Sequence, residues 1–440
     1  GQNNVITIVA SGSLQQEDVV ARAALLAIAD FSTMSVISSA VFANLNEVYA
    51  SAAVGDKTLP EKIFTSYKNK IIGAKLIALA GGAVHSIGLR DDGTLVGFGA
   101  NTYGQLAIPG LAEAWYLKFS PFTRRVSVVA ARDDYSLLLC EDGRVYACGA
   151  NDSLRLGSNI GDETAYPVQV PGLNNIVAIS AGNQHSLAIA GAGQLYVWGA
   201  NASGQLGLGS VSEAGIAPTL VSGISGVTAV AAGNNYSLIV TNGDVFAAGD
   251  NSMYQLTEST VDGSGNPVLN SPAFVQINLP VKAVAVAAGS GHCLVLGVDG
   301  YVYSWGFNDR GQAGLGTSTP FISSPQKIAA PGSVQKIFAG ANHSLMVTTA
   351  GELYVFGDNS LGQLGRPLTT KIVLTPLKNP SFSGVSSAGC SENNSYVIST
   401  TGNYAFGDNS AGQVGNGSAN TDDPLGVATP VLLSIASPWN

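Results

Sequence analysis

The chain has 440 residues, of which 46% are hydrophobic and only 11% are charged, and it contains 54 glycines. This apolar content is enough for a packed core and argues against a disordered chain. A net charge of −9 argues against a broad phosphate-binding surface, so we predict no nucleic-acid partner. No apolar run reaches the roughly 18 residues that span a bilayer, so we predict no membrane insertion.

Residues 1–70 are predicted to form a strand-plus-helices module. A Val- and Ile-rich strand is expected over residues 4–11, followed by helices near 13–30, 34–52 and 59–70. A lone strand is not stable by itself, so it must pair with something. The module either caps the following domain, docks into an assembly or folds independently. The candidate docking residues are Val5, Ile6, Ile8, Val9, Leu25 and Ile28. Because the first residue is Gly1, we also expect a processed or trimmed chain.

A repeat of about 50 residues fills the rest of the chain, residues 71–440. Its anchor is an asparagine with a glycine two residues before it and, in every copy but one, a glutamine four residues after it. The exception carries Arg155 in place of glutamine. The spacings between the asparagines are 50, 50, 50, 57, 51 and 50 residues, and the seven positions are Asn101, Asn151, Asn201, Asn251, Asn308, Asn359 and Asn409.

Each unit reads as three or four short strands. An apolar run ends in small residues, then a strand starts with His or Tyr followed by Ser or Cys in most copies. A turn such as Asp142-Gly143 follows, then a second strand, a loop and a run that begins with proline. Asp-Gly suits a tight hairpin turn, and proline suits a strand edge. We therefore predict an all-β fold, a seven-bladed β-propeller. We expect the run Pro430–Ile435 to complete blade one and close the ring.

The motif HSL…DG…VYxWGxNxxGQLG, clearest at residues 185–207 and 292–314, resembles the regulator of chromosome condensation repeat family. The resemblance implies a seven-bladed propeller. Its members include a guanine-nucleotide exchange factor that binds chromatin, domains of signalling and ubiquitin-ligase proteins, and a secreted bacterial inhibitor of β-lactamases. Exchange activity in the family depends on a projecting β-wedge and an acidic face, and neither maps onto this sequence residue by residue.

Recurrent polar residues are interpreted as structural. The histidines His85, His185, His292 and His343 share one slot of the repeat on different blades, so no metal site is expected. The repeated Asn and Gln side chains are expected to satisfy backbone groups of turns. Cysteines are few and distant, so free thiols are expected at Cys140, Cys148, Cys293 and Cys390. No cofactor motif is present, and no catalytic constellation is visible.

Two irregular segments are candidate partner contacts. The loop after the fourth anchor, residues 257–267, accounts for the spacing of 57, and its candidate residues are Thr257, Glu258, Asp262 and Asn266. Trp115 lies in the irregular connection between the first and second units. Loops on a rigid scaffold commonly carry binding residues.

The sequence predicts a non-enzymatic protein-binding or structural scaffold. It would be a subunit of an extracellular, cell-surface or virion-type assembly, or a secreted binder, with protein partners that include copies of itself. The alternative is a cytoplasmic regulator of the exchange-factor type that acts on a small GTPase. An enzyme with a site on the propeller axis is the weakest alternative.

Overall fold

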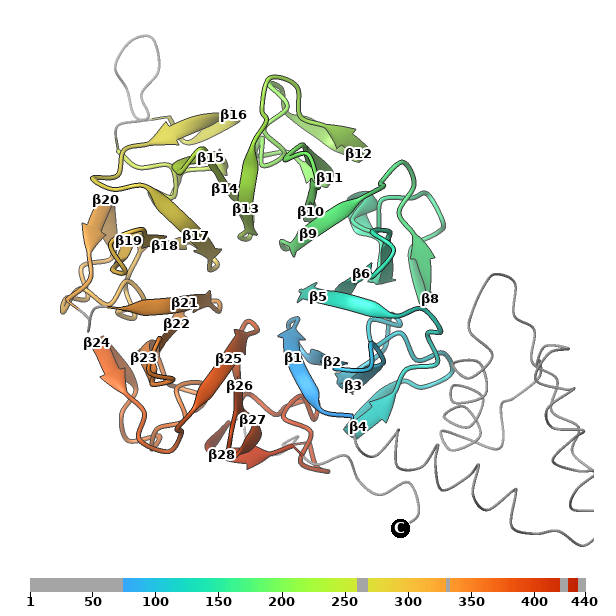
Figure 1. Ribbon diagram of the computed structural model, residues 1–440, viewed down its shortest axis with the longest axis vertical. Coiled ribbons are helices and arrows are strands. Elements are labelled where there is room, and N and C mark those ends of the chain that lie inside the picture. Colours follow the sequence, from blue (N-terminus) through green and yellow to red (C-terminus); the bar gives the residue numbers. More distant parts are fainter. Residues whose placement is uncertain (1–73, 259–267, 330–332, 420–425, 434–440) are drawn as a thin grey trace, which may run out of the picture.

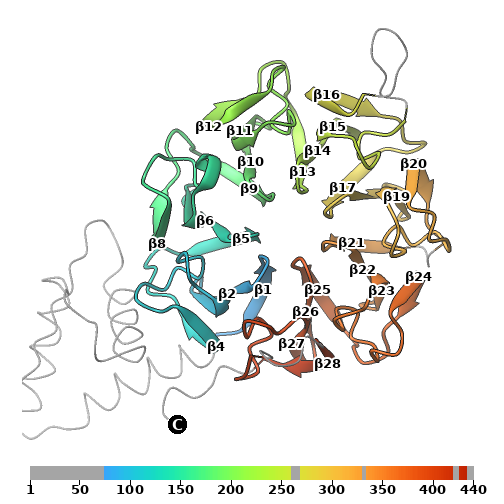
Figure 2. The same ribbon diagram turned by 180° about the vertical axis from the view of Figure 1, so that it is seen from behind.

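The computed structural model describes residues 74–258, 268–329, 333–419 and 426–433. Seven four-stranded antiparallel sheets are arranged around a central axis (Figures 1 and 2). This confirms the predicted all-β, seven-bladed propeller. The proposed module at residues 1–70, with its candidate docking residues, lies outside the described part.

Each blade consists of four consecutive strands, numbered from the axis outward. Blade one contains β1 (Leu76–Gly81), β2 (His85–Arg90), β3 (Leu95–Ala100) and β4 (Glu113–Phe119), and blade two contains β5 (Val126–Arg132), β6 (Tyr135–Cys140), β7 (Val145–Ala150) and β8 (Glu163–Gln169). Blade three contains β9 (Ile176–Ala181), β10 (His185–Ala190), β11 (Leu195–Asn201) and β12 (Ser212–Leu220), and blade four contains β13 (Val227–Ala232), β14 (Tyr236–Thr241), β15 (Asp244–Asp250) and β16 (Asn270–Ile277).

The remaining blades repeat this order. Blade five contains β17 (Ala283–Ala288), β18 (His292–Gly297), β19 (Val302–Phe307) and β20 (Phe321–Lys327), and blade six contains β21 (Val334–Ala339), β22 (His343–Thr348), β23 (Leu353–Asp358) and β24 (Ile372–Lys378). Blade seven contains β25 (Val385–Cys390), β26 (Asn394–Ser399), β27 (Gly402–Gly407) and β28 (Val427–Leu432). A short 3₁₀ helix, η1 (Asp152–Leu154), follows β7.

The predicted C-terminal strand forms but does not complete blade one, so that prediction is wrong. β28 pairs with β27 as the outer strand of blade seven. Blade one takes its outer strand from β4, which follows β3 in sequence. The same holds in every blade, so each proline-containing run joins the hairpin before it rather than the one after it. The physical reason is that consecutive strands joined without a crossover pair with each other, so the chain after the anchor asparagine returns to the free edge of the strand that it has just left.

Since no strand of the described residues is shared between two sheets, the ring is closed by contacts between the sheets. At the junction of blades seven and one, Tyr396 and Ser86 hydroxyl oxygens lie 2.6 Å apart, and Ser86 donates to the Gln413 carbonyl at 3.0 Å. Leu79, Phe98 and other apolar side chains of blade one pack with those of blade seven. Side-chain packing and hydrogen bonds thus replace the shared strand.

At four of the other junctions a repeated histidine contacts a serine of the next blade. His85 lies 2.9 Å from the Ser136 hydroxyl of the next blade, and Ser136 donates to the carbonyl of Gln105 at 2.8 Å. Equivalent pairs are His185–Ser237, His292–Ser344 and His343–Ser395. Because the serine proton goes to the carbonyl, the imidazole Nε2–H must donate to the serine oxygen, which fixes the neutral tautomer.

Tyrosine takes the histidine slot in two blades. The Tyr135 hydroxyl donates to the His185 carbonyl at 2.7 Å, and the Tyr236 hydroxyl donates to the His292 carbonyl at 2.6 Å. Asn394 fills the slot in blade seven, where Tyr396 makes the contact with blade one instead. The four cysteines are not joined by disulfides, as expected.

In five blades a glycine stands three residues before the histidine or tyrosine, and space requires it there. A Cβ atom on Gly182 would lie 2.6 Å from Nδ1 of His185 and 2.8 Å from the carbonyl oxygen of Gly233 in the next blade. We expect Gly182→Ala to lower the free energy of unfolding by about 1–3 kcal/mol through overpacking. Urea unfolding measures this change. Gly191→Ala is the control, because its nearest neighbour would be 3.6 Å away. Equal stability of the two variants would contradict the steric account.

Burial lowers the pKa of His85, His185 and His292 to about 3 and that of His343 to about 4. In the unfolded chain a histidine titrates near 6.5, so between these values the unfolded state binds more protons. Stability is therefore fully present above about pH 6.5 and falls as the pH drops toward 4.

We expect His185→Gln to reduce the slope of stability against pH in this window by up to about 1.4 kcal/mol per pH unit. Urea unfolding between pH 7 and 4.5 measures the slope. Ser237→Ala removes the hydrogen bond but keeps the buried imidazole, so it should lower stability and leave the slope unchanged. An unchanged slope in His185→Gln would show that this histidine is not buried in its neutral form.

Candidate functional site

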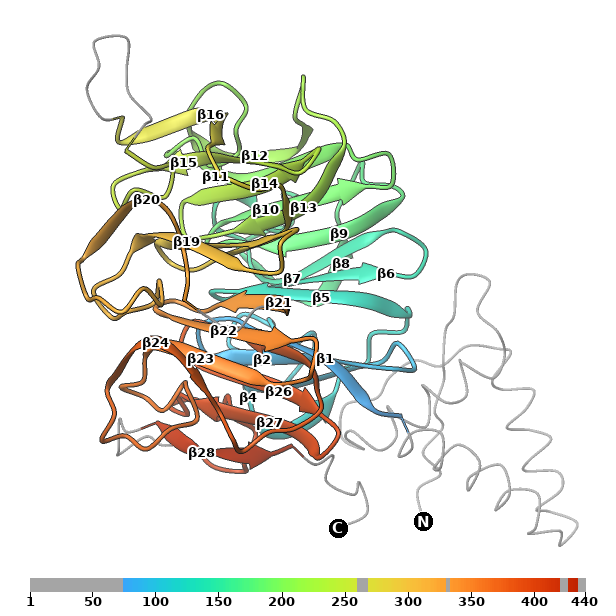
Figure 3. The same cartoon turned by 60° about the vertical axis from the view of Figure 1, so that its left-hand side comes forward.

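The strands of each blade run between two faces of the ring (Figure 3). The loop face carries the turns after each first strand and the longer loops after each third strand. The turn face carries the tight hairpin turns and the connections between blades. A propeller offers partners these two faces, so their charges and shapes are compared first.

The loop face is acidic. Its described acidic side chains, in loops or at strand ends, are Glu113, Asp133, Asp134, Asp152, Asp162, Glu163, Glu213, Asp250, Glu258, Asp309, Asp358, Glu392 and Asp408. Its described basic side chains are only Arg132, Arg155, Arg310, Arg366 and Lys371. Such an excess of one sign attracts a surface of the opposite sign.

The turn face has the opposite balance. Its described basic side chains are Lys75, Arg90, Lys118, Arg124, Arg125, Arg144, Lys282, Lys327, Lys336 and Lys378. The acidic ones are Asp91, Asp92, Glu141, Asp142, Asp244, Asp299 and Glu352, and several are paired, as in Arg125–Glu141 at 3.0 Å. The difference in charge between the two faces therefore makes the loop face the candidate binding surface.

Blade two departs from the repeat on the loop face. Arg155, in the glutamine slot, is 2% exposed and forms ion pairs with Asp133 and Asp152. Its guanidinium carbon lies 5.5 Å from the centre of the Tyr135 ring. Asp133 has a φ of +48° and Leu154 a φ of +60°. Non-glycine residues in this conformation are strained, and such strain is concentrated at functional sites.

Blade four carries a second departure. The third residue after the anchor asparagine is a glycine with positive φ in five blades, but it is Leu154 in blade two and Tyr254, with φ +62°, in blade four. The Tyr254 ring lies 5.9 Å from the ring of Phe321 in blade five, which is 43% exposed. Phe307 also contacts Phe321, with ring centres 5.8 Å apart. An aromatic cluster thus bridges blades four and five.

The proposed partner loop begins beside this cluster. Thr257 has a φ of +69° and is 3% exposed, so its side chain is not at the surface. Glu258 is exposed, and its backbone N–H donates to the carbonyl of Ser323 in blade five at 2.8 Å. Asp262 and Asn266 lie outside the described residues. The structure therefore brings Glu258, but not the Thr257 side chain, to the loop face.

Trp115 lies at the junction of blades seven and one. Its carbonyl accepts a 2.8 Å hydrogen bond from the Gly417 N–H, and its indole covers Gly412. The side chain is still 42% exposed, and the adjacent Tyr116 is 53% exposed. Trp115 is thus part of the junction and also an exposed aromatic residue at its outer rim.

The anchor asparagines organise the long loops. Asn101 is buried, donates to the Ile108 carbonyl at 2.8 Å and accepts from the Leu106 N–H at 2.8 Å. The equivalent backbone N–H bond occurs in every blade, accepted by Asn151, Asn201, Asn251, Asn308, Asn359 and Asn409. The asparagines therefore hold the loop shape and are not available to a partner.

Sequence reasoning noted Arg155 in the glutamine slot but missed a second charged departure in blade two. Arg132 occupies a slot that is glycine in five other blades, and Asp133 follows it. Aligning the seven copies slot by slot would have revealed both. Among the described residues, no group of three or more His, Cys, Asp or Glu side chains is placed to hold a metal ion. No helix in that part of the chain is long and apolar enough to cross a membrane.

Comparisons with known proteins agree with this geometry. A "Protein RCC2 homolog" from Danio rerio is 38% identical over 101 residues, which is 22% of this chain and 20% of the relative. A "Probable E3 ubiquitin-protein ligase HERC6" from Homo sapiens is 34% identical over 141 residues, 31% of this chain and 13% of the relative. The chain thus matches only a fraction of the length of these relatives.

Solved structures show the same fold. Human WBSCR16 has a TM-score of 0.66 at 23% identity, covering 74% of this chain and 87% of its own. Prp20p from Saccharomyces cerevisiae, whose structure was described with its binding properties to Gsp1p and histones, has a TM-score of 0.69 at 21% identity, covering 84% and 90%.

Family models match most of the propeller. The model for the RCC1-like domain matches residues 117–439, and the model for the regulator of chromosome condensation (RCC1) repeat matches residues 77–105. Together with the seven repeated blades, these matches show that the chain belongs to the RCC1-like domain family.

Proposed function

We propose that this propeller is a non-enzymatic protein-binding module that acts as a regulator of the exchange-factor type, with a small GTPase as its partner. The observation that carries the proposal is the acidic loop face, which suits a basic protein surface. The RCC2 homologue among its relatives, and a structural neighbour described with its binding to Gsp1p, support this choice.

The comparisons favour this alternative over the first expectation. No relative or neighbour considered above supports a virion, filament or extracellular scaffold, so those expectations are set aside. The ubiquitin-ligase relative is matched over only 13% of its length, so ligase activity is not carried over to this chain. Protein binding is the property that the repeat itself supports.

The loop face offers three kinds of contact to such a partner. Exposed carboxylates of blade two, including Asp162 and Glu163, would steer a basic surface toward the ring. The Tyr254 and Phe321 cluster supplies an aromatic surface of the type enriched at interfaces. The buried asparagine bonds hold the loops in place before the partner arrives, which lowers the entropy cost of binding.

A nucleotide-release assay with the full chain and a panel of small GTPases tests the activity. We expect faster release for at least one GTPase, and weaker binding of that GTPase at higher salt because the attraction between opposite charges is screened. No stimulation across the panel, together with binding that is indifferent to salt, would contradict the proposal.

A charge reversal locates the interface. We expect Asp162→Lys with Glu163→Lys to weaken binding about tenfold, mostly by lowering the association rate. Surface plasmon resonance of the responding GTPase measures both rates. Asp91→Lys on the turn face is the matched control and should leave both unchanged. Equal losses in both variants would place the interface elsewhere.

A further inference from the structure

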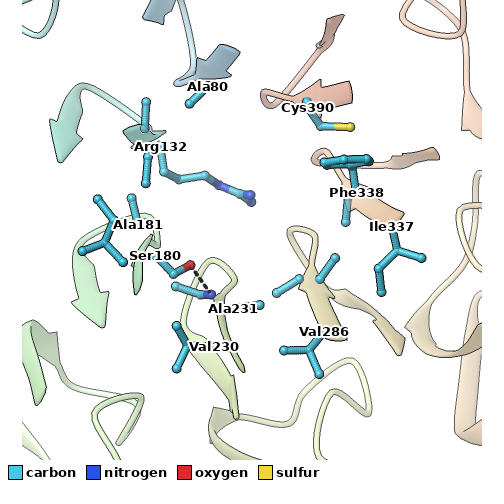
Figure 4. A pocket seen from close by; sticks show the side chains of 18 of the residues that line it. Ala80, Arg132, Ser180, Ala181, Val230, Ala231, Val286, Ile337, Phe338 and Cys390 are labelled. Carbon is cyan, nitrogen blue, oxygen red and sulfur yellow. Dashed lines mark hydrogen bonds between the residues drawn. The ribbon is translucent and has the colours of Figure 1, made fainter. Parts of the chain in front are cut away.

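A cavity of about 270 Å³ lies on the ring axis. It is lined by the first strand of every blade, β1, β5, β9, β13, β17, β21 and β25. These strands are the inner edges of their sheets, so backbone N–H and C=O groups face the axis. The lining side chains are mostly small and apolar, such as Ala80, Ala181 and Ala231 (Figure 4).

Arg132 is the one cation among the residues that line this cavity. It ends β5 in a slot that is otherwise occupied by Gly82, Gly182, Gly233, Gly289 and Gly340, with Ser391 in blade seven. Figure 4 shows its side chain extending from β5 across the cavity. A long charged side chain thus stands where the repeat otherwise places a glycine or a serine.

Among the described residues, the buried guanidinium has only neutral hydrogen-bond partners. Arg132 is 5% exposed, and its Nη2 donates to Asn234 Oδ1 at 2.9 Å and to Ser290 Oγ at 3.4 Å. Its Nε has no hydrogen-bond partner in the described part of the chain. No ion pair joins Arg132 to a carboxylate within the described ranges. A buried charge without a counter-charge is costly, so such a charge is kept for a reason other than stability.

Within the described ranges, no neighbouring carboxylate, Glu392 included, forms an ion pair with Arg132. Asp133 is paired with Arg155 instead, and Asp134 accepts a hydrogen bond from Gln105 at 3.4 Å. Burial raises the pKa of the Glu392 carboxyl, although Arg132 partly opposes the rise. Arg155 therefore shows what a neutralised buried arginine looks like in this protein, and Arg132 differs from it.

We propose that Arg132 is the centre of an axial binding site for a small inorganic oxyanion of the phosphate or sulfate class. The guanidinium supplies the charge and a planar set of donors, which suits such anions. Asn234 and Ser290 accept from Arg132 and so hold the guanidinium in position. The cavity volume and its polar strand edges suit a small hydrated anion rather than a bulky apolar ligand.

Isothermal titration of the full chain with inorganic phosphate, at constant ionic strength set with chloride, tests the site. We expect binding with a dissociation constant of about 1 mM or tighter. Arg132→Gln keeps a polar side chain but removes the charge, and it should weaken binding at least about tenfold. Arg125→Gln, on the turn face, is the matched control and should bind phosphate like the unmodified chain.

Arg132→Gly is a second variant that should fold normally, because glycine is the usual residue in this slot. It separates a loss of phosphate binding from a loss of folding. Without phosphate, its thermal unfolding midpoint should equal or exceed that of the unmodified chain, because an unneutralised buried charge is removed. With phosphate, only the unmodified chain and Arg125→Gln should be stabilised. No phosphate binding by the unmodified chain, equal binding by Arg132→Gly, or a lower midpoint for Arg132→Gly without phosphate would each overturn the site.

Discussion

The hydrogen bond from a buried imidazole or phenol to the next blade is the contact on which the ring depends. In the part of the chain that the structure describes, no strand is shared between sheets, so each junction is held by side chains and a few backbone bonds. A buried donor without a partner costs free energy. Breaking a junction therefore leaves the donor and the acceptor either exposed to water or buried without a hydrogen-bond partner. Blade seven shows how strong the requirement is, because Tyr396 supplies the contact that Asn394 in the usual slot does not make.

This arrangement separates stability from binding. The buried asparagine, glutamine, histidine and serine side chains are used within the ring and are similar in most blades. Departures from the pattern are then free to serve a partner, and they are found in blades two and four. Leu154 and Tyr254 hold strained backbone conformations that glycine adopts in the other blades. Their side chains must offset this strain with contacts that glycine cannot make.

The periodic part of the structure was predictable from the sequence. Asparagine spacing gave the number of blades, and the Xaa-Gly turns placed the hairpins. The sheet that the last strand joins was not predictable, because an apolar run such as Pro430–Ile435 fits the open edge of either neighbouring sheet. The choice depends on the loop before it, which favours the nearer edge. Residues 1–70 remain a sequence prediction.

The candidate site was less predictable, for physical reasons. The acidic loop face arises from residues far apart in sequence, and it becomes visible only when each is assigned to one end of a strand. Thr257 was expected at a partner surface, but its positive-φ slot turns the side chain inward. Trp115 was chosen as an irregularity, and the structure gives it a place in the junction of blades seven and one.

The most direct test of the account compares one junction with another. Tyr135→Phe removes a hydroxyl from the junction of blades two and three, and Tyr396→Phe removes one from the junction of blades seven and one. If all junctions are equivalent, urea unfolding will show losses of about 0.5–2 kcal/mol in each variant that agree within about 0.5 kcal/mol. A loss in Tyr135→Phe with none in Tyr396→Phe would show that the ring is closed by something other than this contact.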